Sequence, residues 1–157
     1  MFPIKGVIKR YINLQEEPID PEKFFKNIRK KSEDMGYLFF EREHVSAVKK
    51  YGEQLEFKFF IEKEIDQFAK VEISVAVVFE KLEKVKNKYI GEGTLTYAVD
   101  LIYDYKNRWG KNKFDKFLFS LYMKIMKWTF ENKYLIPYAI MEGNEIYDSI
   151  KADLETY

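Results

Sequence analysis

Three runs of residues between Leu55 and Tyr105 alternate apolar and polar side chains with a period of two. This is the period of a β-strand that has one buried face and one exposed face. The apolar positions are Leu55, Phe57, Phe59 and Ile61 in the first run, Val71, Ile73, Val75, Val77 and Phe79 in the second, and Leu95, Tyr97, Val99, Leu101, Tyr103 and Tyr105 in the third. Residues 4–14 and 37–48 give weaker strand signals. The pattern predicts an antiparallel sheet of about five or six strands that is covered on one face.

A helix is predicted between the first two strands. Asp20 is a favourable N-cap, Pro21 suits the first helical position, and Gly36 suits the residue after the last turn. Apolar residues between them recur at helical spacing, at Phe24, Phe25, Ile28 and Met35.

After Gly110 the period becomes helical. Polar residues three or four positions apart form one stripe, and nearly every other residue from Phe114 to Glu131 is apolar. This predicts a long helix over 114–131, about 27 Å in length. Pro137 is expected in the connection that follows, and Asn144 is expected to cap a short terminal helix.

These elements predict one α+β domain over residues 1–157. It has one N-terminal helix, a curved antiparallel sheet that wraps a long C-terminal helix, and a short terminal helix. This order resembles the helix-grip fold of the START and Bet v1-like superfamily, and the resemblance rests on residues 55–105 and 114–131. The resemblance implies an apolar cavity between sheet and helix that takes lipids or other hydrophobic molecules.

Composition excludes several classes of protein. Apolar residues make up 46% of the chain and charged residues 34%, which is too apolar for a disordered chain and too charged for a membrane protein. The chain has no Cys and so no disulfide or thiolate site, which favours the cytoplasm. Residues 1–14 contain Lys5, Lys9 and Arg10, so we expect no signal peptide. The abundance of Lys, Glu and Ile is typical of thermophiles and also of A/T-rich genomes.

The candidate catalytic residues are few. His44 is the only histidine, and no Cys or second His can complete a triad or a nitrogen-rich metal site. Asp100 and Asp104 share a predicted strand face about 13 Å apart, which is too far for a pair of glycosidase carboxylates. We read them as solvated charges. The sequence therefore favours a protein that is not an enzyme and holds no metal or cofactor.

The first functional hypothesis is the binding of a hydrophobic small molecule or lipid between the sheet and the long helix. The hydroxyl groups of tyrosines on the apolar strand face could form hydrogen bonds to a ligand in an otherwise apolar pocket. The simpler role for each of these tyrosines is to pack in the hydrophobic core. The residues predicted to line the site are Tyr97, Tyr103, Phe117, Leu121 and Met126. Trp109 is predicted to plug the end of the core beside the long helix. In the alternative, Tyr103 and Trp109 border an opening, and a ligand is first expected there.

The alternative is a protein-interaction or homodimerisation module without a small ligand. The second apolar side of the long helix would then be the contact surface, formed by Phe119, Met123, Met126 and Phe130. A basic cluster lies just before and within this helix, at Lys106, Arg108, Lys111, Lys113 and Lys116. The chain as a whole has a net charge of only +1, so a nucleic-acid partner is disfavoured.

Overall fold

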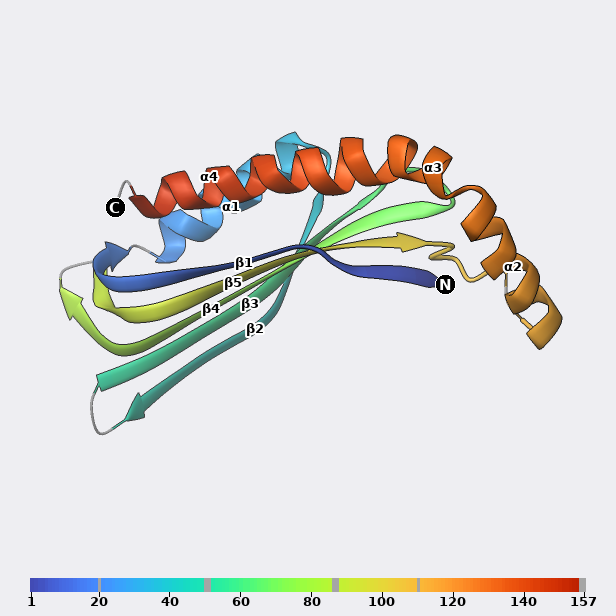
Figure 1. Cartoon of the computed structure of the whole chain (residues 1–157). Helices are drawn as coiled ribbons and strands as arrows, with labels where there is room; N and C mark the ends of the chain where they lie inside the picture. The colour runs from blue at the N-terminus through green and yellow to red at the C-terminus, as the bar shows by residue number, and fades with distance from the viewer. Residues whose placement is uncertain (20, 50–51, 86–87, 110, 156–157) are drawn as a thin grey trace.

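The computed structural model shows an α+β architecture of two layers, a five-stranded antiparallel sheet and a layer of helices on one of its faces (Figure 1). It describes residues 1–19, 21–49, 52–85, 88–109 and 111–155. Side chains are described for these residues except 14–19, 21–22, 42–49, 52–55, 80–85, 88–92 and 155. The predicted fold class is confirmed.

The sheet has the strand order β1-β5-β4-β3-β2, and every neighbouring pair is antiparallel. Its strands are β1 (Phe2–Ile19), β2 (Leu38–Lys49), β3 (Gly52–Glu64), β4 (Ala69–Val85) and β5 (Lys88–Tyr103). The last four form a meander in chain order, and β1 pairs with β5 at the far edge. Several strands extend beyond their apolar runs, because backbone pairing continues where the sequence becomes polar.

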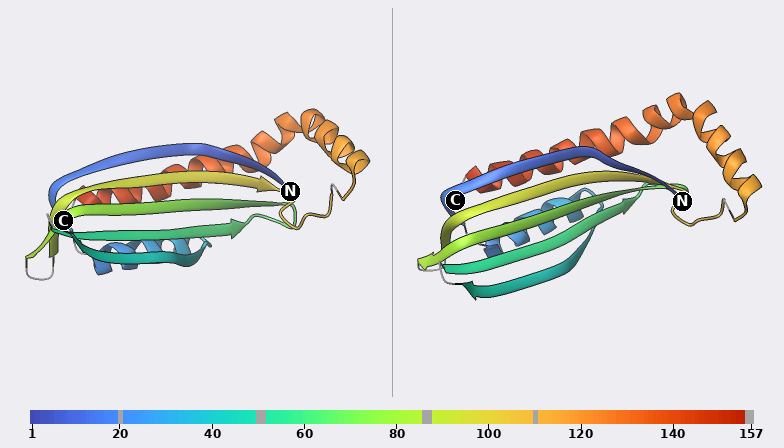
Figure 2. Two further views of the ribbon diagram at one scale, coloured as in Figure 1. Left: turned by 90° about the horizontal axis from the view of Figure 1, so that it is seen from below. Right: turned by 60° about the horizontal axis from the view of Figure 1, so that its bottom comes forward.

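One face of the sheet is buried and the other is not, as the alternation predicts. In β4 the core positions Val71, Ile73, Val75 and Val77 are all but inaccessible, whereas Ser74 between them is exposed. The helices of the described chain lie over the buried face, except that residues 113–125 lie beyond the end of the sheet (Figure 1). The view from below shows the opposite face without a helix over it (Figure 2).

Helix α1 (Pro21–Asp34) ends in a Schellman motif. Gly36 has a φ of +87°, its N–H donates to the carbonyl of Glu33 at 3.0 Å, and the N–H of Tyr37 donates to the carbonyl of Ser32 at 2.9 Å. Gly36 therefore ends the helix as the sequence predicts. The predicted N-cap, Asp20, lies outside the described residues.

The C-terminal helices differ from the predicted bounds. Helix α2 (Lys113–Ile125) ends at Met126, and the helix that crosses the sheet runs from Lys127 to Glu155. The crossing helix consists of α3 (Lys127–Phe130), the π-helical segment η1 (Glu131–Glu142) and α4 (Gly143–Glu155). Pro137 lies inside η1 and Asn144 inside α4, so neither marks a boundary. The wider π-helical turns accommodate a residue that lacks an N–H and would crowd an α-helix.

The crossing helix approaches the sheet closely at Gly143. A Cβ atom at this position would lie 3.1 Å from side-chain atoms of Ile8 and of Val99. The hydroxyl of Tyr97 donates to the carbonyl of Gly143 at 2.6 Å. This contact closes the space between the middle of the sheet and the helix.

A partly buried polar cluster ties three elements together near the end of α1. Lys63 on β3 donates to the carboxylate of Glu142 on η1 at 3.0 Å and to the carbonyl of Met35 at 2.9 Å. The hydroxyl of Tyr37 donates to the same carboxylate at 2.8 Å. The cluster fixes the crossing helix relative to β3 and to the end of α1.

Candidate functional site

The turn between β3 and β4 holds one wall of an apolar pocket. Asp66 Oδ1 accepts hydrogen bonds from the backbone N–H groups of Phe68 at 2.7 Å and Ala69 at 3.0 Å. The hydroxyl of Tyr105 donates to the carbonyl of Asp66 at 2.7 Å. These bonds fix the turn and direct the ring of Phe68 toward α3, where it lies 5.3 Å from the ring of Phe130.

The loop after β5 is organised around Asp104. Its side chain is only 2% exposed, and its two oxygens accept from the backbone N–H groups of Arg108 at 2.9 Å and Trp109 at 3.0 Å. Asp104 is therefore a buried loop anchor, which corrects its interpretation as a solvated charge. The carboxylate can be buried because it accepts these hydrogen bonds.

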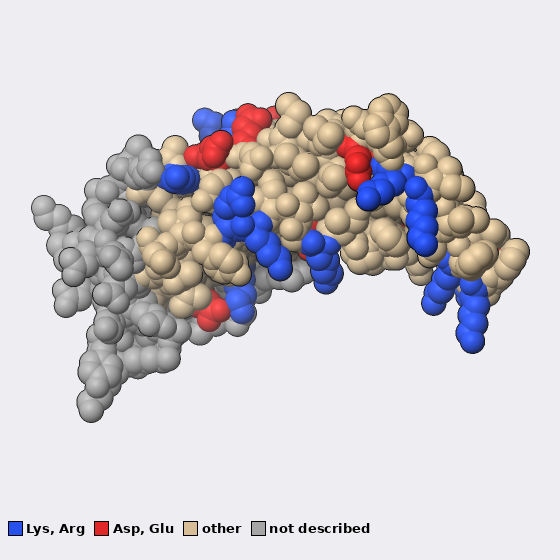
Figure 3. Space-filling view, viewed as in Figure 1, with Lys and Arg blue, Asp and Glu red and all other residues tan. Residues whose placement is uncertain are grey.

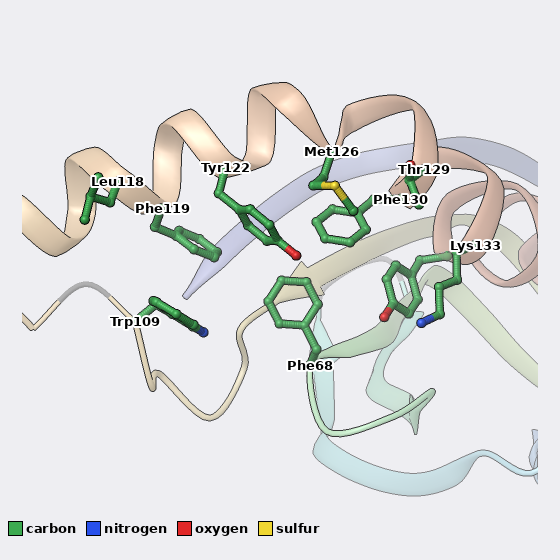
Figure 4. Close-up of a pocket in the computed structure, with 10 residues that line it drawn as sticks. Phe68, Trp109, Leu118, Phe119, Tyr122, Met126, Thr129, Phe130 and Lys133 are labelled. Carbon is green, nitrogen blue, oxygen red and sulfur yellow. The ribbon is translucent and has the colours of Figure 1, made fainter.

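Trp109 is 55% exposed and borders an opening. The prediction that it plugs the end of the core is wrong. The loop that Asp104 anchors carries the indole past the end of the sheet, so that it faces α2 across the pocket (Figure 4).

The N-terminus of helix α2 is capped by the side chain of Asn112, and few residues of the helix are buried. Asn112 Oδ1 accepts from the backbone N–H of Asp115 at 2.8 Å. Phe119 and Met123 are the buried residues of α2. The ring of Phe119 lies edge-on to Phe2 at 6.1 Å and to Phe68 at 6.3 Å. Through these contacts α2 is attached to the end of the sheet.

The space enclosed by α2, α3 and the two loops is a pocket of about 640 Å³. Aromatic and aliphatic side chains from the helices and loops converge on it (Figure 4). Its lining consists of Phe68, Trp109, Leu118, Phe119, Tyr122, Met126, Thr129, Phe130, Lys133 and Tyr134. Its size is typical of pockets for small organic ligands, which are commonly about 300 to 1,000 Å³.

Lys133 and Tyr134 lie at one end of this pocket, beside Asp66. The hydroxyl of Tyr134 donates to Asp66 Oδ2 at 2.7 Å, and Lys133 Nζ lies 4.0 Å from the same oxygen. Partial burial acts to raise the pKa of Asp66, but the hydrogen bonds from Tyr134 and from the backbone of Phe68 and Ala69 hold it below its usual value. Burial, together with the hydrogen bond to Asp66, raises the pKa of Tyr134. Asp66 is therefore ionised and Tyr134 neutral at pH 7.

The five residues predicted to line a ligand site do not come together. Tyr97 is fully buried under Gly143, and Tyr103 is 2% exposed and packs between Phe68 and Phe130. Only Met126 lines the pocket.

Phe117 and Leu121 lie on the outer side of α2, 64% and 46% exposed. The surface predicted for a partner is turned the other way. Phe119, Met123 and Phe130 are at most 8% exposed and face the sheet. The inner and outer sides of α2 are therefore exchanged relative to the prediction.

Phe68 was not predicted from the sequence to form a wall of this pocket. Phe68 stands in a turn and shares no periodic pattern with α2. Asp66 was a detectable signal, because an Asp two residues before Phe68 can fix a tight turn.

The described side chains contain no group of three His, Cys, Asp or Glu residues that could hold a metal ion. His44 lies on β2, outside the residues whose side chains are described. No helix in the described part of the chain has both the length and the apolar character needed to cross a membrane.

No protein-family model matches the chain, and no curated protein is significantly similar to it in sequence.

Proposed function

We propose that this protein binds a hydrophobic small molecule or lipid in the pocket between α2, α3 and the end of the sheet. The observation that carries the proposal is the lining itself, in which aromatic and aliphatic side chains surround about 640 Å³ of open space. Such a pocket gains free energy by removing apolar ligand surface from water.

The ligand class follows from the distribution of polar groups. Lys133 is the only charged side chain among the ten that line the pocket, and it lies beside Tyr134 at one end. An acyl chain or another elongated apolar group suits the remainder, with an anionic head group near Lys133. The element order, a strand, a helix, a four-stranded meander, helix α2 and the crossing helix, supports the resemblance to the helix-grip superfamily.

The proposed site is not the space between the middle of the sheet and the crossing helix. Tyr97 bonds to Gly143 there, and its neighbours Val75 and Val99 are buried, so the described residues fill that space. The open pocket lies at the end of the sheet.

Two substitutions on neighbouring turns of α2 test the proposal. Leu118→Arg places a charge in the lining, whereas Leu121→Arg places the same charge on a position of similar exposure outside it. We expect Leu118→Arg to weaken the binding of a fluorescent long-chain fatty acid by at least about tenfold, because the ligand would bury an unpaired charge. Leu121→Arg is expected to bind like the unmodified protein.

Native mass spectrometry of the purified protein gives an independent measurement. We expect a mass above that of the chain by one apolar small molecule, which organic extraction releases. A chain that carries no such molecule and does not bind the fatty acid contradicts the proposal, as does equal weakening by the two Arg variants.

A further inference from the structure

Helix α2 presents a second apolar surface, which we call the outer face. Its residues recur every three or four positions on the side opposite Phe119 and Met123. On α2 they are Phe114 (67% exposed), Phe117 (64%), Leu118 (42%), Leu121 (46%) and Ile125 (72%). Trp128 (75%), at the start of α3, follows Ile125 by three positions and is included in the outer face. Large side chains so exposed and so closely grouped mark a surface that contacts something else.

The described part of the chain leaves the outer face uncovered. The sheet and the loops contact α2 through Phe119 on its inner side, and the helix extends from the end of the molecule (Figure 1). The outer face therefore requires a partner from outside the described chain.

The charge around the outer face indicates what kind of partner fits. Residues 106–133 contain eight Lys or Arg and two Asp or Glu, a net charge of +6 in a chain whose total is +1. The rest of the chain therefore carries −5. Lys and Arg side chains project from the surface at the end of the molecule formed by α2 (Figure 3).

Three exposed lysines of α2, Lys113, Lys116 and Lys124, lie along one border of the outer face, and the exposed Lys127 follows at the start of α3. We call these four residues the lysine stripe. None of them forms an ion pair with a described residue. Their charge is therefore available to an external anion.

We propose that α2 docks on the surface of a membrane that contains anionic lipids. The outer face enters the boundary between head groups and acyl chains, and the lysine stripe lies at the level of the phosphates. A helix with Trp, Phe and Leu on one side and Lys on the other is suited to lie in this plane. A second copy of the chain fits less well as the partner. Residues 106–133 of the two copies, each with a net charge of +6, would repel each other.

This docking places the pocket beside the lipid. Leu118 belongs both to the outer face and to the pocket lining, and Tyr122 on the next turn lines the pocket while 47% exposed. The mouth of the pocket therefore adjoins the docked surface. The docking stands on the exposed face and its charge, so it holds whether or not the pocket takes a ligand.

Vesicle binding tests the docking. We expect the protein to sediment with vesicles of equal amounts of phosphatidylcholine and phosphatidylglycerol, and not with phosphatidylcholine alone. Raising the salt from about 0.1 M to about 1 M, which shortens the screening length from roughly 10 Å to 3 Å, should release most of it. In the Trp109→Phe variant Trp128 is the only tryptophan, and its emission should shift to shorter wavelength on binding.

Variants separate the two contributions. Changing all four lysines of the stripe to Gln should weaken binding by at least about 100-fold, since each cation near the surface contributes roughly fivefold. Phe117→Gln/Leu121→Gln/Ile125→Gln should abolish the shift of Trp128 emission while leaving the pocket lining intact. The matched control is Leu38→Gln/Met141→Gln, two positions 62% exposed elsewhere on the molecule, which should bind normally.

Three outcomes would overturn the docking proposal. The first is equal binding to neutral and anionic vesicles, or to neither. The second is a dimer in analytical ultracentrifugation that the three outer-face substitutions dissociate. The third is binding that depends on the lysines alone, which would indicate a general polyanion surface. Failure of fatty-acid binding with normal vesicle binding would contradict the pocket proposal only.

Discussion

Tyr97 and Tyr103 lie on the same face of β5 but differ in what their hydroxyl groups contact. The Tyr97 hydroxyl donates to Gly143 of the crossing helix, whereas the Tyr103 hydroxyl makes no hydrogen bond to a described residue. The ring of Tyr103 instead packs on Phe68, Phe130 and Tyr134 at 5.3 to 5.7 Å. The alternation of apolar and polar residues places both tyrosines on the buried face of the sheet. It cannot show that only Tyr97 forms a hydrogen bond to the backbone of the crossing helix.

This difference predicts unequal effects of the same substitution. Tyr97→Phe should lower the free energy of unfolding by about 1 kcal/mol, the usual contribution of one hydrogen bond. Tyr103→Phe should change it by less than about 0.5 kcal/mol. Urea unfolding at pH 7 measures both. Equal losses would show that the bond to Gly143 contributes nothing specific.

Helix α2 is the least supported of the longer elements, because Phe119 and Met123 are its only buried residues. Its stability therefore depends on local interactions, above all on the Asn112 cap. Asn112→Ala should cost the helix about 1 kcal/mol and raise the hydrogen-exchange rate of α2 amides about fivefold. The exchange of β4 and β5 amides should not change. Asn112→Gly, which retains much of the capping preference, is the control, and a rise in all elements alike would contradict a local role.

The two sides of α2 also show where prediction from sequence stops. Period-two alternation identified the sheet and its buried face. Polar residues occupy one face of each strand, so only the other face can be buried. The inner and outer sides of α2 are both aromatic and aliphatic, so periodicity identified a helix with two apolar sides and could not choose between them. The choice is made by Phe2 and Phe68, which meet Phe119 from distant parts of the chain.

Pro137 and Asn144 misled the prediction of the crossing helix for a related reason. Both residues weaken an isolated α-helix, and a boundary near them was the local expectation. Packing outweighs this local cost, because η1 and α4 bury Tyr134, Ala139, Ile146 and Ile150 against the rest of the molecule. The missing Cβ of Gly143 is what permits the close approach.

At the scale of the molecule, four tyrosines that are buried among the described side chains connect the sheet to the helices: Tyr37, Tyr97, Tyr103 and Tyr134. Burial is the main reason that the pKa of each is raised, and it brings that of Tyr103 to about 12. In the unfolded chain tyrosine releases its proton near pH 10. The native state therefore holds protons that the unfolded state loses at alkaline pH.

The free energy of unfolding therefore falls as the pH rises above the ordinary pKa of tyrosine. Since the folded-state pKa values lie above the unfolded ones, stability is complete below about pH 10 and falls as the pH rises further. Each tyrosine contributes up to about 1.4 kcal/mol per pH unit to this slope. Urea unfolding from about pH 8 to about pH 11 should show the fall, and Tyr97→Phe should reduce its steepness by up to that amount. Because the lysines titrate alike in both proteins, the comparison isolates Tyr97, and identical slopes would contradict a raised pKa at this position.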